Sequence, residues 1–156
     1  MPHLTLDTSL GPLRLVSDGE ALTTATFDLD VEADEADESD AVLDAARDQL
    51  AAYFDGEPVA FDVPVRLGGT PFQERVWAAL QGIPHGATLS YGDLARRLGM
   101  PQAAQAVGAA NGQNPVAVVV PCHRVIGANG ALVGYAGGLE RKRALLALEN
   151  RQRSLF

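Results

Sequence analysis

The chain has 156 residues, 47% of them hydrophobic, and a formal net charge of -8, which fits a globular protein with one ordinary core or two small ones. Its single cysteine excludes an internal disulfide and any zinc site built on two thiolates, so we expect no metal. No stretch approaches about 18 consecutive apolar residues and the N-terminus lacks the pattern of a signal peptide, so we expect a cytoplasmic protein without a membrane partner.

The charge is distributed unevenly along the chain. Residues 1–66 carry 16 acidic and three basic side chains, whereas residues 67–156 carry four acidic and nine basic ones, giving net charges of -13 and +5. This split favours a C-terminal half that binds a polyanion. Two solvated surfaces of opposite sign explain the charge alone equally well.

The N-terminal part predicts a three-stranded antiparallel sheet followed by a helix. Apolar residues alternate between positions 4 and 27, with turns at Gly11-Pro12 and Asp18-Gly19. Residues 28–40 hold eight carboxylates and no base, which is typical of a solvated connector. Ser39 is placed to cap a helix that runs to residue 54, and residues 59–65 predict a further strand.

A Leu-Gly-Gly segment at residues 67–69 marks the expected boundary between an N-terminal domain, residues 1–66, and a C-terminal domain, residues 67–156. Thr70 and Gln73 form a capping-box pair that predicts a helix to residue 81, and Ser90 caps a second helix over residues 91–98. Pro101 begins a third helix, to residue 110. The predicted fold class is α+β, with a mostly helical C-terminal domain of the helix-turn-helix or winged-helix kind.

The last two of these helices have helix-turn-helix spacing, which many helical hairpins share. The helix predicted from Pro101 to residue 110 consists almost entirely of small residues, which would let its backbone approach a narrow minor groove. Tight packing on a neighbouring helix is the alternative. The expected DNA-contacting residues are Gln102, Ala103, Ala104, Gln105, Ala106, Gly108 and Arg124.

The only cysteine, Cys122, follows an apolar run at residues 116–120 that predicts a buried strand. A thiol becomes nucleophilic as its thiolate and therefore needs a basic partner, for which the adjacent His123 is the candidate. Neighbouring side chains of an extended strand point to opposite faces, so the pair requires a bridging water or a bend at Pro121.

A carboxylate commonly orients a histidine of this kind. Glu149 is the candidate, because in a helix over residues 138–150 it shares the apolar face of Leu145 and Leu146. A helix-end carboxylate that reaches Arg151 or Arg153 is the alternative. Asn114 precedes the apolar run, where its amide either holds the turn or supports the thiol.

The residues of this region resemble the O6-alkylguanine-DNA alkyltransferase family. The resemblance lies in the segment from Asn114 to Val125 (NPVAVVVPCHRV), in residues 134–139 (GYAGGL) and in the ending LLALE at residues 145–149. Residues 70–77 and Ser90-Tyr91 extend it, so it covers residues 70–150 densely and residues 1–66 loosely.

The resemblance implies a single, irreversible transfer of an alkyl group from guanine O6 in duplex DNA to Cys122, after the base is flipped out from the minor-groove side. It implies that His123 acts as base through a water, that Glu149 polarises His123 and that Asn114 supports the turn. Tyr91 would hydrogen-bond guanine N3, and Val125, Tyr135 and Ala136 would line the pocket. No cofactor is implied, and the protein is expected to act as a monomer.

Two positions depart from the family pattern, since Gln105 stands where an arginine is usual and Ala136 replaces a hydroxyl residue of some members. Two other functions remain open. A non-catalytic alkyl-damage binding protein would lack Cys122, and a cysteine hydrolase using Cys122 and His123 would turn over repeatedly.

Overall fold

The computed structural model describes residues 1–27, 37–132, 134, 135 and 137–154. The chain forms two compact units: Met1–Leu67 with Pro115–Val119, and Gly68–Asn114 with Val120–Phe156. The predicted boundary at residue 66/67 lies beside the division at Leu67/Gly68, but Pro115–Val119 belongs to the first unit, and no local sequence pattern predicts this return. Residues 28–36 of the acidic segment, and Ala136, lie outside the described residues.

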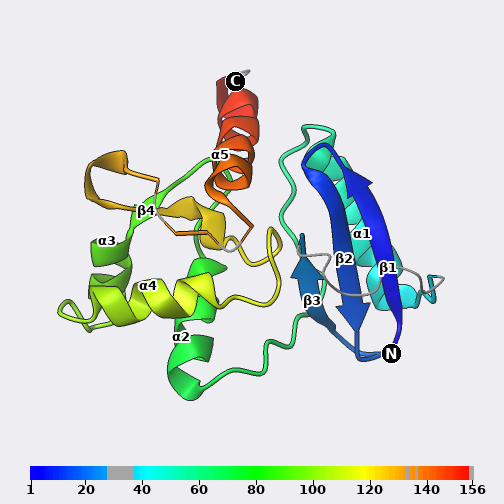
Figure 1. The fold of residues 1–156 in the computed structure, drawn as a ribbon, viewed down its shortest axis with the longest axis horizontal. Helices are drawn as coiled ribbons and strands as arrows, with labels where there is room; N and C mark the ends of the chain where they lie inside the picture. The colour runs from blue at the N-terminus through cyan, green and yellow to red at the C-terminus, as the bar shows by residue number, and fades with distance from the viewer. Residues whose placement is uncertain (28–36, 133, 136, 155–156) are drawn as a thin grey trace. The chain divides into compact units, whose positions relative to one another are not determined.

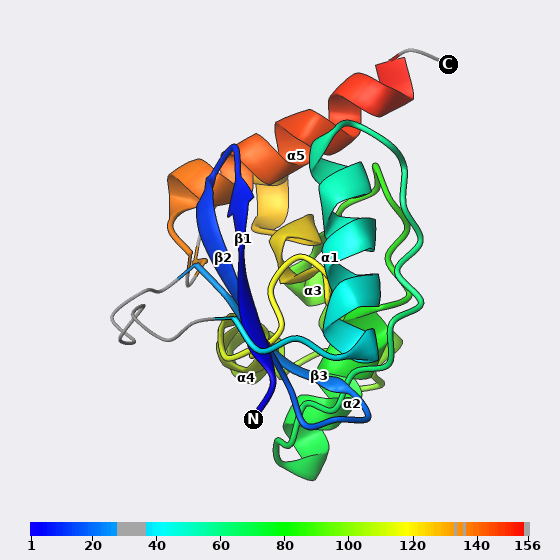
Figure 2. The same cartoon turned by 90° about the vertical axis from the view of Figure 1, so that its right-hand side faces the viewer.

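The first unit contains the predicted antiparallel sheet, in the order β1 (His3–Thr8), β2 (Gly11–Ser17) and β3 (Leu22–Thr26). Leu13 and Leu15 alternate along β2 and are fully buried, as the period-2 pattern predicts. Helix α1 (Ala41–Phe54) packs along the sheet, and Leu43 and Leu50 lie on its fully buried face (Figures 1 and 2). The three-stranded sheet with one helix is confirmed.

Two local predictions in this unit are wrong. Asp40, not Ser39, caps α1, because its carboxylate accepts the backbone N–H of Leu43 at 2.8 Å. Residues 59–65 form no strand, only an isolated bridge between Val65 and Leu22. Pro64 lacks the N–H that a continuous ladder requires.

The second unit contains α2 (Pro71–Leu80), α3 (Tyr91–Arg97), α4 (Ala104–Gly112) and α5 (Leu139–Ser154). The capping box of Thr70 and Gln73 is present, and Ser90 caps α3, as predicted. Two short strands, β4 (Leu89–Ser90) and β5 (Val125–Ile126), pair in parallel. The 3-10 turns η1 (Cys122–Arg124) and η2 (Ala128–Gly130) flank β5. None of the described helices combines the length and the apolar character needed to cross a bilayer.

The helix predicted from Pro101 begins three residues later, at Ala104, so Gln102 and Ala103 precede it. Ala103 occupies the N-cap position without a side-chain cap. The prediction based on Pro101 therefore placed the start of this helix three residues too early.

The apolar run before Cys122 is buried but is not a strand. Only Val116 forms an isolated bridge, with Ala25, and Val118 has a left-handed φ of 71°. A β-branched residue rarely adopts that conformation, so this turn is strained. Backbone hydrogen bonds of 2.9 Å from Ala25 N–H to the Pro115 carbonyl and from Ala117 N–H to the Ala25 carbonyl hold the segment in the first unit.

Candidate active site

Cys122 lies at the first position of the 3-10 turn η1, after Pro121 at its N-cap. The thiol side chain is 6% exposed. We expected an extended strand or a bend at Pro121, and the 3-10 turn that follows Pro121 is this bend. Asn114 supports the approach to this turn, because its Nδ2 donates to the carbonyl of Val120 at 2.8 Å.

His123 and Glu149 form the contact that the sequence suggested. Nε2 of His123 lies 2.7 Å from Oε2 of Glu149, with both side chains almost completely buried. Glu149 comes from α5, whose apolar face it shares with the fully buried Leu145. The helix-end alternative, in which Glu149 reaches Arg151 or Arg153, does not explain these contacts.

Arg124 completes a buried cluster around the same carboxylate. Its Nε donates to Oε1 of Glu149 at 2.8 Å and its NH2 donates to Oε2 at 3.1 Å, while NH1 donates to the carbonyl of Ile83 at 2.6 Å. The guanidinium is therefore buried and hydrogen-bonded on three sides. The expectation that Arg124 contacts DNA is not consistent with this position, and we replace it with a structural role at Glu149.

Electrostatics assign the proton positions in this cluster. Burial opposes ionisation of Glu149, but the hydrogen bonds and charges of His123 and Arg124 outweigh it and hold the pKa of Glu149 below its usual range. Burial lowers the pKa of His123, and the contact with Glu149 only partly offsets this. A neutral imidazole beside an ionised carboxylate donates from Nε2, which leaves Nδ1 as a proton acceptor. Among the described residues Nδ1 has no hydrogen-bond partner.

Burial raises the pKa of Cys122, so burial disfavours the nucleophilic thiolate. A hydrogen bond from Asn114 and the charge of Lys142 act in the opposite direction. Within the described part of the chain no hydrogen bond joins the thiol directly to His123. A proton transfer from Cys122 to Nδ1 of His123 would therefore require an intervening molecule, which is the water relay that the resemblance implies.

Lys142 is a functional candidate that the sequence analysis missed. It is fully buried on α5, and its Nζ donates to the Val125 carbonyl at 2.6 Å and lies 5.8 Å from the centre of the Tyr91 ring. Burial lowers the pKa of Lys142. Its position three residues before Leu145 and seven before Glu149 places it on the same helix face, so the argument used for Glu149 would have found it.

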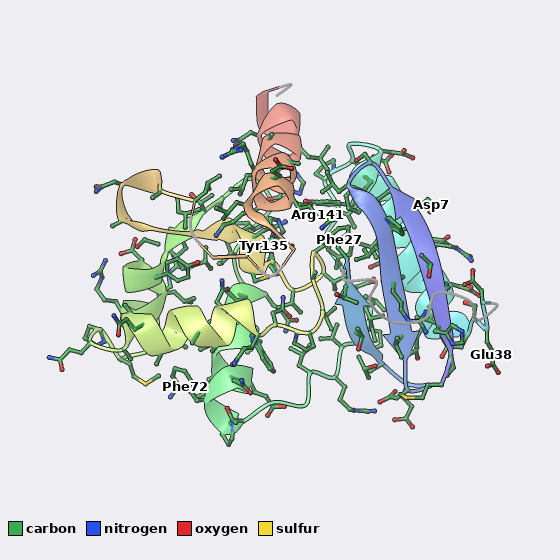
Figure 3. The ribbon with its side chains drawn as sticks, in the orientation of Figure 1. Asp7, Phe27, Glu38, Phe72, Tyr135 and Arg141 are labelled. Atoms are coloured by element: carbon green, nitrogen blue, oxygen red, sulfur yellow. The ribbon has the colours of Figure 1, made fainter. Side chains whose placement is uncertain are left out.

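The two tyrosines predicted to line the pocket, Tyr91 and Tyr135, both belong to the second unit. Tyr91 is the first residue of α3 and is half-buried. A Cβ at Gly108 of α4 would lie 3.5 Å from the Tyr91 ring, and a Cβ at Gly134 would lie 3.8 Å from the Tyr91 hydroxyl. Tyr135 lies in the segment that leads into α5, whose first turn carries Arg141 (Figure 3). Burial raises the pKa of Tyr135, and its hydroxyl has no partner among the described residues.

Helix α4 presents a small, neutral face. Val107 and Ala110 are buried, whereas Gln105, Ala106 and Ala109 are exposed on one side of the helix, and Gln102 is exposed in the preceding turn. Of the predicted DNA-contacting set, Ala103, Ala104 and Gly108 are partly exposed. The exposed face carries no side chain longer than glutamine.

A buried cysteine, a histidine–carboxylate pair behind it and a helix-turn-helix with a small-residue second helix define a DNA-binding protein with a nucleophilic thiol. Comparison with known proteins identifies the family. Residues 71–151 match the domain described as "6-O-methylguanine DNA methyltransferase, DNA binding domain", and residues 1–67 match its "ribonuclease-like domain". The chain belongs to the 6-O-methylguanine DNA methyltransferase family.

Individual relatives support this over nearly the full length. The methylated-DNA–protein-cysteine methyltransferase of Mycobacterium tuberculosis (strain ATCC 25618 / H37Rv) is 51% identical over 150 residues, which cover 94% of this chain and 91% of the relative. That of Methanosarcina acetivorans is 45% identical, covering 96% and 98%. A crystal structure of Mycobacterium tuberculosis OGT in complex with DNA matches with a TM-score of 0.87 at 50% identity, covering 97% of this chain and 94% of that one.

Proposed function

We propose that this protein repairs O6-alkylguanine in duplex DNA by moving the alkyl group irreversibly to Sγ of Cys122. The observation that carries the proposal is the buried arrangement of Cys122, His123 and Glu149. The only thiol of the chain directly precedes a buried histidine in the same 3-10 turn, and a carboxylate sets the tautomer of that histidine. Family membership and the full-length relatives named for this activity support it.

The chemistry is a displacement at the alkyl carbon. The S–C bond forms as the C–O6 bond breaks, and the electron pair of the broken bond stays on guanine. The thiol proton passes through a water to Nδ1 of His123 and then to solvent, while guanine takes up a proton from solvent at N1. The product thioether has no leaving group that restores the thiol, so each molecule reacts once.

The remaining predicted residues take positions around this step. Asn114 would hold the turn before Cys122, and Tyr91 would donate a hydrogen bond to guanine N3 as the leaving group gains charge. Tyr135 and the backbone of Val125 would bound the pocket. The exposed residues Gln102, Gln105, Ala106 and Ala109 would lie in the minor groove.

Intact-protein mass spectrometry tests the proposal after incubation with duplex DNA containing O6-methylguanine. We expect one added methyl group per molecule, on Cys122, and no further turnover. Cys122→Ser should accept no methyl group while still binding the duplex. Repeated product release would instead indicate a hydrolase, and binding without any mass gain would indicate a non-catalytic damage-binding protein.

We further propose that the protein acts as a monomer in the cytoplasm. A reduced compartment suits a chain that depends on one free thiol. Light scattering of the free protein and of its complex with a short duplex tests the monomeric state.

A further inference from the structure

Asn111 is a buried polar residue near the active site with no role assigned so far. It lies near the end of α4 and is only 1% exposed. Its Nδ2 donates to the carbonyl of Cys122 at 3.3 Å. The neighbouring carbonyl of Ala110 accepts a hydrogen bond of 2.8 Å from the indole of Trp77, so this end of α4 is fixed by the core. Asn111 therefore joins α4 directly to the turn that carries the nucleophile.

The ring of Tyr91 lies beside the same helix, since a Cβ at Gly108, about one turn before Asn111 on α4, would lie 3.5 Å from it. Burial raises the pKa of Tyr91, and a side-chain hydrogen bond with Asn111 acts in the opposite direction. A hydrogen bond that lowers the pKa of a phenol donates to its oxygen. The NH2 group of an asparagine has two hydrogens, which suffice for the Cys122 carbonyl and the Tyr91 oxygen.

The orientation of the amide is fixed by this arrangement. The carbonyl of Cys122 only accepts hydrogen bonds, so the NH2 group has to face it. The other end, Oδ1, is then buried, and it has no partner among the described residues. A buried acceptor without a partner destabilises a protein, so an asparagine at this position is not explained by folding alone.

We propose that Asn111 is a positioning residue for alkyl transfer, whose amide holds the Tyr91 hydroxyl with its own proton directed at the substrate and ties it to the Cys122 turn. The inference rests on the proposed role of Tyr91 at guanine N3. Because the Tyr91 oxygen accepts from Asn111, its O–H points away from the amide, and in the complex it would donate to guanine N3. The same N–H stabilises the negative charge that the Tyr91 oxygen gains as guanine leaves.

The first experiment is a double-mutant cycle on the reaction rate with free O6-benzylguanine, which requires no base flipping. Asn111→Ala should react about tenfold more slowly, the rate equivalent of one hydrogen bond. In the Tyr91→Phe background the same substitution should cause no additional loss, because its target is absent. Independent, multiplicative losses would overturn the proposal.

A second substrate tests the same point without a second mutation. O6-Benzyl-3-deazaguanine has no N3 acceptor, so Asn111→Ala should slow its reaction much less than that of O6-benzylguanine. Equal slowing of both substrates would mean that Asn111 acts on Cys122 or on packing rather than through Tyr91, and would overturn the proposal.

Stability supplies the control. Asn111→Ala should lower the melting temperature, because the buried Cys122 carbonyl loses its donor. Val107→Ala, one turn earlier on the buried face of α4, should also lower the melting temperature but keep the wild-type rate, which separates lost stability from lost positioning. If Asn111→Ala does not fold, Asn111→Asp keeps the size and removes both donors, and the same cycle applies. A wild-type rate for Tyr91→Phe would overturn the role of Tyr91 and this inference together. A slow Tyr91→Phe with a normal Asn111→Ala would overturn this inference alone.

Discussion

Nε2 of His123 lies 2.7 Å from Oε2 of Glu149, and Arg124 binds both oxygens of the same carboxylate. One buried carboxylate thus fixes the tautomer of the proposed base and neutralises a buried guanidinium. The two functions have different consequences, because the contact with His123 governs proton transfer and the pair with Arg124 governs stability.

Glu149→Gln should slow alkyl transfer at neutral pH by about tenfold or more, since a neutral amide no longer raises the basicity of His123. Duplex affinity should change little. The rate measured from pH 6 to 9 gives the pH profile, and an unchanged rate and profile would leave Glu149 with a structural role only. Loss of the buried charge pair also destabilises the fold, so Arg124→Lys serves as the control: it disturbs the Arg124 contacts and keeps the His123–Glu149 contact.

Acid should destabilise the protein in two stages. The pKa of His123 is lowered in the folded state, so below about pH 6.5 the unfolded chain binds a proton that the folded chain does not. The pKa of Glu149 is also lowered, so its contribution is present above about pH 4.3 and is lost as the pH falls further. Urea unfolding between pH 8 and 5 should show a decline that begins near pH 6.5 and is reduced in His123→Gln. A flat wild-type curve would contradict this.

The parts of the fold that the sequence predicted carry local signals. The hairpins alternate polar and apolar residues, and α2 has its complete capping box at Thr70 and Gln73. The apolar residues at 116–120 predict that this segment is buried but do not predict its secondary structure. An apolar run without periodicity does not distinguish a strand from a buried turn, and the left-handed Val118 depends on tertiary packing that no local pattern encodes.

The candidate site shows the same division. Glu149 was predictable because a carboxylate on an apolar helix face requires a buried partner. Lys142 gives the same signal on the same face of α5 and was overlooked. Arg124 was assigned to DNA, but its partner Glu149 lies 25 residues away in the sequence and is identified only by the fold.

The basic charge of the second unit predicts an electrostatic contribution to DNA affinity. Arg97 is exposed at the end of α3, next to the turn before α4. Arg97→Glu should weaken duplex binding and make the plot of log affinity against log salt shallower by about one. Arg47→Glu changes the charge equally on α1 of the acidic unit and should have little effect. Fluorescence anisotropy at several salt concentrations measures both. Equal losses in the two variants would indicate a general charge effect rather than a contact at α3.

Gln105 is exposed on α4, on the same face as Ala106 and Ala109. An arginine at this position would add a fixed charge near two phosphate strands and a planar group that stacks and donates several hydrogen bonds in the gap left by a flipped base. Glutamine offers one neutral amide, so we expect base flipping to be weaker than with arginine but present.

Gln105→Arg should therefore speed repair of O6-methylguanine in duplex DNA and leave the reaction with free O6-benzylguanine nearly unchanged, because the free base needs no flipping. The two second-order rate constants, measured side by side, separate extrusion from chemistry. Gln102→Arg is the matched control, since it adds the same charge at another exposed glutamine, one position before the N-cap of α4. If both variants accelerate duplex repair equally, the gain comes from charge alone. An equal gain on both substrates, or none on duplex DNA, would mean that residue 105 does not control base extrusion in this protein.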